Sequence, residues 1–140
     1  MALTRDELID IAHEHAAAEA GTDIDRVLVT LDPDPVYELQ PVGLVFRGMA
    51  SARTYYEHFF ATFRPTVAGY QLRNEWVADD GVGQEYVIDV RADGGAIERH
   101  AVIGILTFGE AGLSGERLYA GERMLRLMFG PAFDLAEPLT

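Results

Sequence analysis

The sequence contains no cysteine and no lysine, so all eleven basic side chains are arginines. Without cysteine the chain has no disulfide, no thiolate nucleophile and no cysteine-bound zinc. Without lysine it cannot form a Schiff base with a carbonyl substrate. Long apolar runs are also missing, because the longest uncharged one, 101–109, is far below the roughly 20 residues of a membrane span. We therefore expect no membrane partner.

Positive charge is scarce as well. Eleven arginines face 23 acidic residues, which gives a net charge of −12 at pH 7. Phosphate binding requires clustered basic side chains, so a nucleic-acid partner is not expected. Four charged residues in the first ten positions exclude the apolar core of a secretory signal there: Arg5, Asp6, Glu7 and Asp10. A cytoplasmic protein is the resulting expectation.

The 140 residues, 49% of them hydrophobic, predict one domain spanning 1–140. Thr4 and Glu7 form a capping box that begins a helix to about Glu19. A short helix is predicted over 23–31, and the aromatic-rich helix over 49–64 has the clearest helical spacing.

Strands are predicted where the apolar period changes to two. They cover 36–40, 44–47, 70–78, 84–91, 97–108 and 113–119. A closing helix follows over 121–128. Helices followed by a run of long strands predict an α+β domain, with the helices packed on one face of a bent antiparallel sheet.

The hairpin turns allow a register to be predicted. With a two-residue turn in each hairpin, one row of residues crosses one sheet face: Trp76, Glu85, Val102 and Tyr119. A second row on that face contains Asn74, Val87, His100 and Gly121. A one-residue slip at 93–95 instead places His100 beside Ile88 and breaks the arrangement. In the predicted register, a few convergent polar groups among apolar neighbours indicate a pocket lining; the alternative is a sheet rim that meets water or a partner chain.

These segments together resemble the SnoaL-like branch of the nuclear-transport-factor-2-like superfamily. The resemblance is carried by Val36-Tyr37-Glu38-Leu39, by Gly48 with the Ala52-Arg53-Thr54-Tyr55-Tyr56 helix, and by Glu116-Arg117-Leu118-Tyr119 before Leu125 and Gly130. It covers essentially the whole chain. It implies a cone-shaped roll with an internal apolar cavity, and homodimers that pair through the outer face of the sheet. Because the superfamily includes cyclases, isomerases, epoxide hydrolases, dehydratases and members without known activity, the fold alone specifies no reaction.

One departure from the resemblance concerns the end of the last strand. Members with cyclase activity tend to carry an aspartate there, in a pattern like Tyr-x-Asp, whereas this chain reads Tyr119-Ala120-Gly121. Glu122 follows with the opposite strand parity. The missing carboxylate removes the expected partner of His100 and places the cyclase mechanism in doubt for this chain.

Glu85 and His100 are the predicted catalytic residues. A carboxylate desolvated by Trp76 and Val102 would have a raised pKa and serve as general acid or base. The alternative is a purely structural ion pair. The residues predicted to bind the ligand are Tyr37, Tyr56, Phe60, Trp76, Val102, Arg117 and Tyr119; an aromatic stripe at helical spacing is more often core, and Arg117 more often forms an ion pair.

No metal site and no cofactor are predicted. His13 and His15 lie two apart on a helix, so they point to different faces, and His15 is expected in the core or at a pocket rim. No glycine-rich phosphate-binding loop opens a helix. Three hypotheses remain: a cofactor-independent isomerase, cyclase or hydrolase; a non-catalytic protein that binds a small hydrophobic or aromatic ligand; and a dimerisation module.

Overall fold

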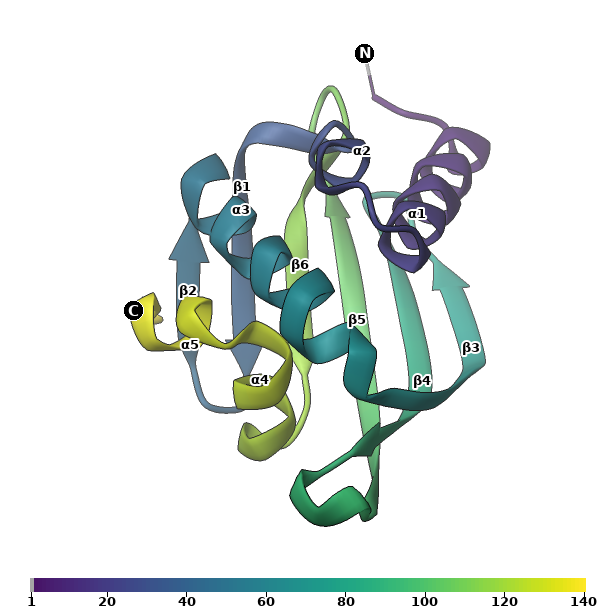
Figure 1. Cartoon of the computed structure of the whole chain (residues 1–140). Helices are drawn as coiled ribbons and strands as arrows, with labels where there is room; N and C mark the ends of the chain where they lie inside the picture. The colour runs from purple at the N-terminus through teal and green to yellow at the C-terminus, as the bar shows by residue number, and fades with distance from the viewer. Residues whose placement is uncertain (1) are drawn as a thin grey trace.

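The computed structural model describes residues 2–140 and folds them as helices on one side of a seven-stranded sheet (Figure 1). The α-helices of this range are α1 (Arg5–Ala20), α2 (Ile24–Leu28), α3 (Met49–His58), α4 (Glu122–Phe129) and α5 (Pro131–Leu135). The strands are β1 (Leu31–Gln40), β2 (Leu44–Arg47), β3 (Val67–Val77), β4 (Gly81–Arg91), β5 (Ile97–Phe108), β6 (Leu113–Tyr119) and β7 (Glu137–Pro138). The predicted α+β class is confirmed.

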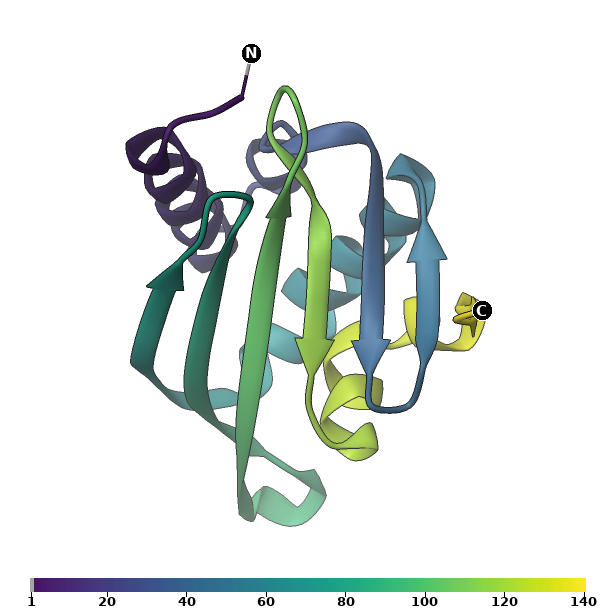
Figure 2. The ribbon, with the colours of Figure 1, turned by 180° about the vertical axis from the view of Figure 1, so that it is seen from behind.

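The strands lie in the order β3-β4-β5-β6-β1-β2-β7. Neighbours are antiparallel except β1 and β6, which are parallel. Figure 1 shows the helices against one face of the sheet, here called the helix-covered face. Figure 2 shows the other face, the open face, over which no helix of residues 2–140 lies. Gly104, Leu106, Glu116 and Leu118 point to the helix-covered face, whereas Ile103 and Arg117 alternate with them and point to the open face.

The helices that carry the later site begin and bend as the sequence dictates. The Thr4 side chain accepts from the Glu7 N–H, and the Glu7 carboxylate accepts from the Thr4 N–H, so the predicted capping box is confirmed. The buried stripe of α1 is Leu8, Ala12, His15 and Ala18. After α3 the chain widens into a π-helical turn, Phe59–Phe63, and then a 3₁₀ turn, Arg64–Thr66. This widening turns aromatic side chains toward the sheet.

The predicted register was wrong at the hairpin between β3 and β4, where Trp76 pairs with Gly83, and Glu85 pairs with Asn74 instead of Trp76. It was also wrong at the hairpin between β4 and β5. Asp93–Gly95 forms a 3₁₀ turn in which Gly94 and Gly95 both have positive φ, and the Ala92 N–H donates to the Ala96 carbonyl. This longer connection pairs Ile88 with His100 and Glu85 with Ile103. The register is therefore shifted by one residue, and His100 pairs with Ile88 rather than with Val87 as predicted.

A bulge shifts the end of β6. Gly115 pairs with Val36 of β1 at φ +148, and the β5–β6 register changes between Thr107 and Phe108. The shift pairs Tyr119 with Ile103 rather than Val102. It also directs Glu116 to the helix-covered face, where its carboxylate is buried.

The remaining differences from the predicted elements are local. Strand β1 begins at Leu31, so the prediction of a helix that reaches this residue was wrong at its end. Helix α5 and strand β7 were not predicted. Within residues 2–140 the structure contains no helix with the length and apolar character required to cross a membrane.

Candidate functional site

A cavity of about 500 Å³ lies between α1, the π-helical turn and the helix-covered face of the sheet. Most of its wall is apolar. Five aromatic side chains contribute to it: Tyr55, Phe59, Phe63, Tyr70 and Tyr86. Arg64 lies at the wall and its guanidinium donates to the carbonyls of Ala20 and Gly21, at the end of α1. A volume and lining of this kind suit a small, mostly apolar molecule.

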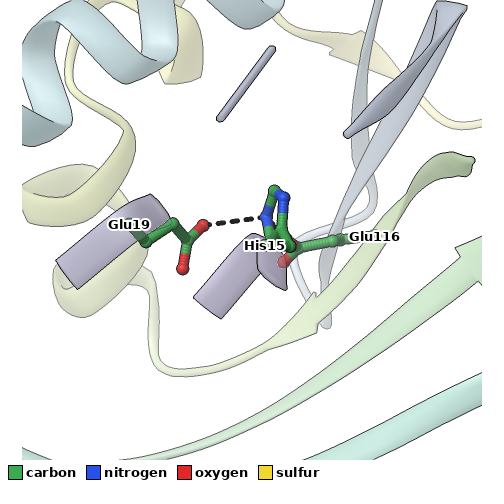
Figure 3. Close-up of side chains that lie close together, drawn as sticks. All are labelled: His15, Glu19 and Glu116. Carbon is green, nitrogen blue, oxygen red and sulfur yellow. Dashed lines mark hydrogen bonds and ion pairs between the residues drawn. The ribbon is translucent and has the colours of Figure 1, made fainter. Parts of the chain in front are cut away.

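The polar part of the cavity is a cluster of three titratable side chains, His15, Glu19 and Glu116 (Figure 3). His15 Nε2 lies 3.0 Å from Glu19 Oε1 and 3.2 Å from Glu116 Oε1. His15 is 2% exposed and Glu116 is 8% exposed. Two residues four apart on α1 thus meet a third from β6, 101 positions later than His15.

Two tyrosines extend this cluster, which we call the His15 cluster, into a chain of hydrogen bonds. The Tyr56 hydroxyl lies 3.1 Å from His15 Nε2, 3.2 Å from Glu19 Oε1 and 3.0 Å from the Tyr37 hydroxyl. Burial raises the pKa of both phenols well above the usual range. Both therefore keep their protons at neutral pH and act as donors.

Thr30 determines which nitrogen of His15 carries a proton. The Thr30 hydroxyl donates its only hydrogen to the Val27 carbonyl at 2.6 Å. It must therefore accept at its second contact, 2.7 Å from His15 Nδ1, so Nδ1 carries a hydrogen. The other ring nitrogen, Nε2, faces the Glu19 and Glu116 carboxylates and is the one that can gain or lose a proton.

The charges in the cluster oppose the effect of burial. Burial lowers the pKa of His15, but the attraction of the Glu19 and Glu116 carboxylates outweighs it and raises the pKa to about 10. Burial raises the pKa of the Glu116 carboxyl, against the hydrogen bond from His15 that lowers it. The cluster therefore holds a proton between imidazole and carboxylate across the neutral range.

The structure does not bring the two predicted catalytic residues together. Glu85 and Ile88 are three apart on β4, so Glu85 and the partner of Ile88, His100, point to opposite faces. Glu85 accepts from Asn74 Nδ2 at 2.9 Å. His100 contacts Glu98 at 3.2 Å, and Arg123 donates to the same carboxylate. The prediction that Glu85 and His100 act together assumed a two-residue turn between β4 and β5. The longer turn at 93–95 gives a different register.

The seven predicted binding residues separate into three groups. Tyr37 and Tyr56 belong to the hydrogen-bond chain at the His15 cluster. Val102 is in the core, and Phe60 is half-buried beside the rings of Tyr56 and Phe59. The other three lie on the open face, away from the cavity: Trp76, Arg117 and Tyr119. The bulge at Gly115 explains the placement of the last two, because it reverses which β6 residues face the helices.

Sequence reasoning missed Glu19 and Glu116 as site residues. For Glu116 a signal was present, since it shares strand parity with Leu118, an apolar residue that belongs in the core. Glu19 is four residues after His15 and therefore on the same helix face. The position expected to hold an aspartate, Gly121, is the N-cap of α4, and Glu122 is exposed.

The comparisons with known proteins concern the fold. No profile of a known protein family matches the chain, and no curated protein matches it. Solved structures do match. An NTF-2 like protein of unknown function from Burkholderia xenovorans has a TM-score of 0.63 at 19% identity, over 84% of this chain and 85% of its own.

Two further solved structures have related descriptions. A protein from Catenulispora acidiphila with a ketosteroid isomerase-like fold, in complex with trimethylamine, has a TM-score of 0.64 at 17% identity, over 89% of this chain and 95% of its own. The epoxide hydrolase/cyclase-like enzyme SalBIII, of pyran ring formation in salinomycin, has a TM-score of 0.69 at 15% identity, over 84% and 93%. At these identities the matches establish the fold that the resemblance predicted.

Proposed function

Since the chain has the nuclear-transport-factor-2-like fold, we propose that it binds a small, mostly apolar molecule in the internal cavity and directs that molecule's polar group toward the His15 cluster. The observation that carries the proposal is the cavity itself: about 500 Å³ of mainly apolar wall with His15, Glu19 and Glu116 in its lining. A cavity needed only for packing would have no reason to bury His15 and Glu116 beside the partly exposed Glu19, because burying charged groups costs free energy even when they are paired.

The same geometry supports acid–base chemistry on the bound molecule as a second candidate function. Glu116 and His15 are a hydrogen-bonded carboxyl and imidazole, and Tyr56 donates to Glu19 beside them. A carboxyl, an imidazole and a phenol within one hydrogen-bond network suit isomerisation, cyclisation or hydrolysis, in which a proton moves at carbon or oxygen. The enzyme SalBIII, described as epoxide hydrolase/cyclase-like, has the same fold.

Ligand binding is expected to raise the melting temperature. In a thermal-shift screen of steroids, polyketides, terpenoid epoxides and fatty acids, a ligand at about a hundred times its dissociation constant stabilises the protein by roughly 2.7 kcal/mol. Gly104 faces the cavity with only Leu118 near its added Cβ, at 3.5 Å. The variant Gly104→Leu places a bulky side chain in the cavity and should reduce the shift.

The control for this screen is Gly121→Ala, at a position with no atom within 4 Å of an added Cβ; it should keep the shift. Glu116→Gln separates the two functions, because it should abolish turnover of a substrate while leaving much of its affinity. If no compound in the screen shifts wild type more than Gly104→Leu, the binding proposal is wrong.

We also propose that the open face joins two copies of the chain. It carries large exposed side chains, with Trp76, Ile103 and Tyr119 at 52%, 40% and 41% exposed. Trp76 and Ile103 border a depression on this face together with Arg117. Apolar exposure of this kind favours burial against a second copy of the chain.

The oligomeric state tests this proposal. Light scattering after size exclusion should give the mass of a dimer for wild type and of a monomer for the double variant Trp76→Glu, Ile103→Glu. The matched control is Leu135→Glu, an exposed leucine on α5, which should remain dimeric. A monomeric wild type at micromolar concentration would rule out the open-face dimer.

A further inference from the structure

We propose that His15, Glu19 and Glu116 form a binding site for a divalent transition-metal ion such as Zn²⁺ or Mn²⁺. The inference goes beyond the proposed ligand binding and is tested separately from it. The sequence spacing of His13 and His15 excludes that histidine pair, but the fold supplies a different set: an imidazole, a carboxylate one helical turn later, and a carboxylate from β6. One nitrogen and two oxygens, without thiolate, suit Zn²⁺, Mn²⁺ or Fe²⁺.

The spacing of the three donor atoms fits one ion. Metal–ligand bonds of about 2.1 Å that meet at roughly 90–110° hold neighbouring donor atoms about 3.0–3.4 Å apart. His15 Nε2 lies 3.0 Å and 3.2 Å from the Glu19 and Glu116 oxygens, and all three atoms lie within 4.8 Å of one another. Small side-chain rotations of Glu19, which is partly exposed, would close the remaining distance.

Thr30, which is not one of the three proposed ligands, orients His15 for metal binding. Its hydroxyl is committed as a donor to Val27, so it accepts from His15 Nδ1–H. Metal-bound histidines nearly always donate their other ring N–H in this way, because that fixes the tautomer and orients the ring. The Nε2 lone pair and two carboxylate oxygens then converge, and such a convergence requires a cation: a proton or, as we propose, a metal ion.

The site also has room on one side. His15, Glu19 and Glu116 line the cavity, so an ion held by them has an open coordination position that faces the bound ligand. A bound divalent ion would act there as a Lewis acid toward a ligand oxygen. The chain's own residues would hold the ion, and Tyr56, whose hydroxyl donates to Glu19 Oε1 at 3.2 Å, would orient that carboxylate.

A second histidine–glutamate pair provides a matched control. His100 Nε2 lies 3.2 Å from Glu98 Oε1, the same spacing as His15 to Glu116. This carboxylate, however, is held by Arg123 at 2.6 and 2.7 Å, and no third carboxylate joins the pair within residues 2–140. Comparing variants of the two sites therefore tests whether metal binding requires all three of His15, Glu19 and Glu116, or only a histidine beside a glutamate.

The experiment is isothermal titration of the full chain, freed of metal with a chelator, with Zn²⁺ and then Mn²⁺. We expect one ion per chain. His15→Gln, Glu116→Gln and the partly exposed Glu19→Gln should each weaken binding more than about a hundredfold, and Thr30→Val about tenfold to a hundredfold, with Thr30→Ser close to wild type. His100→Gln should bind as wild type. Co²⁺ substitution should give visible absorption bands that vanish in Glu19→Gln.

Several results would overturn the metal site. These are no saturable binding of either ion by wild type, binding unchanged in folded Glu19→Gln, or binding lost in His100→Gln. Melting curves recorded with each variant show which ones are folded. If apolar ligands still shift the melting temperature with chelator present and no ion binds, the metal inference fails while the proposed function stands. If an ion binds but no apolar ligand shifts the melting temperature, the proposed ligand binding fails while the metal site stands.

Discussion

Replacing Gly115 with alanine is expected to lower the free energy of unfolding by more than about 4 kcal/mol. Gly115 has φ +148, a conformation that glycine adopts without strain and other residues rarely adopt. An added Cβ would overlap the carbonyl oxygen of Val36 and lie 2.6 Å from its carbon. Neither backbone can move freely, because β1 and β6 are paired from Val36 to Gln40.

Denaturant unfolding measures this effect, and two other glycines separate its parts. Gly43 has φ +75 with no atom within 4 Å of an added Cβ, so Gly43→Ala isolates the backbone strain, about 1 kcal/mol. Gly121 has neither strain nor overlap, so Gly121→Ala should cost only the replacement of a glycine N-cap, at most about 1 kcal/mol. A loss for Gly115→Ala no greater than that for Gly43→Ala would show that β6 does not lie where the structure places it.

The chelated protein should become less stable as the pH rises from 6.5 toward 10. The folded-state pKa of His15, about 10, exceeds its ordinary value of 6.5. Below pH 6.5 both folded and unfolded chains hold the proton, and the stabilisation is fully present. Above it only the folded chain holds the proton, so the free energy of unfolding falls by up to about 1.4 kcal/mol per pH unit. The stabilisation is lost as the pH passes the folded-state pKa.

The measurement is urea unfolding at pH 6.5 through 9.5, for wild type and for His15→Gln. The difference between the two curves isolates His15, because the other titrating groups are common to both. It should narrow steadily with pH. Parallel curves would mean that the Glu19 and Glu116 carboxylates do not hold a proton on His15. Histidine NMR titration provides an independent value for the same pKa.

Much of the fold follows from local signals in the sequence. The Thr4–Glu7 capping box and the aromatic spacing of α3 each determine structure within a few positions. The turn residues located the hairpins but did not give their registers. Such signals predicted the class, most element boundaries and the layer arrangement. Local rules work here because helix caps and tight turns depend on residues adjacent in sequence.

The candidate site could not be predicted in the same way. The partners His15 and Glu116 are separated by 101 positions, and their contact depends on two backbone details, the turn at 93–95 and the bulge at Gly115. Each detail moves every following side chain to the other face of its strand. A register argument based on ideal turns therefore favoured Glu85 and His100, although the buried Glu116 was on the correct parity.

The parallel pairing of β1 with β6 has a consequence for synthesis of the chain. These strands are neighbours in the sheet, yet β6 begins at Leu113, long after β1 ends at Gln40. Contacts this distant in sequence slow folding, since the intervening loop must close before they form. A nascent chain that has not yet released Glu116 from the ribosome leaves His15 without that carboxylate partner and Tyr37 without its paired residue on β6. The pocket thus matures only after β6 has left the ribosome, and chaperones should bind nascent chains truncated before β6 more strongly than chains that include it.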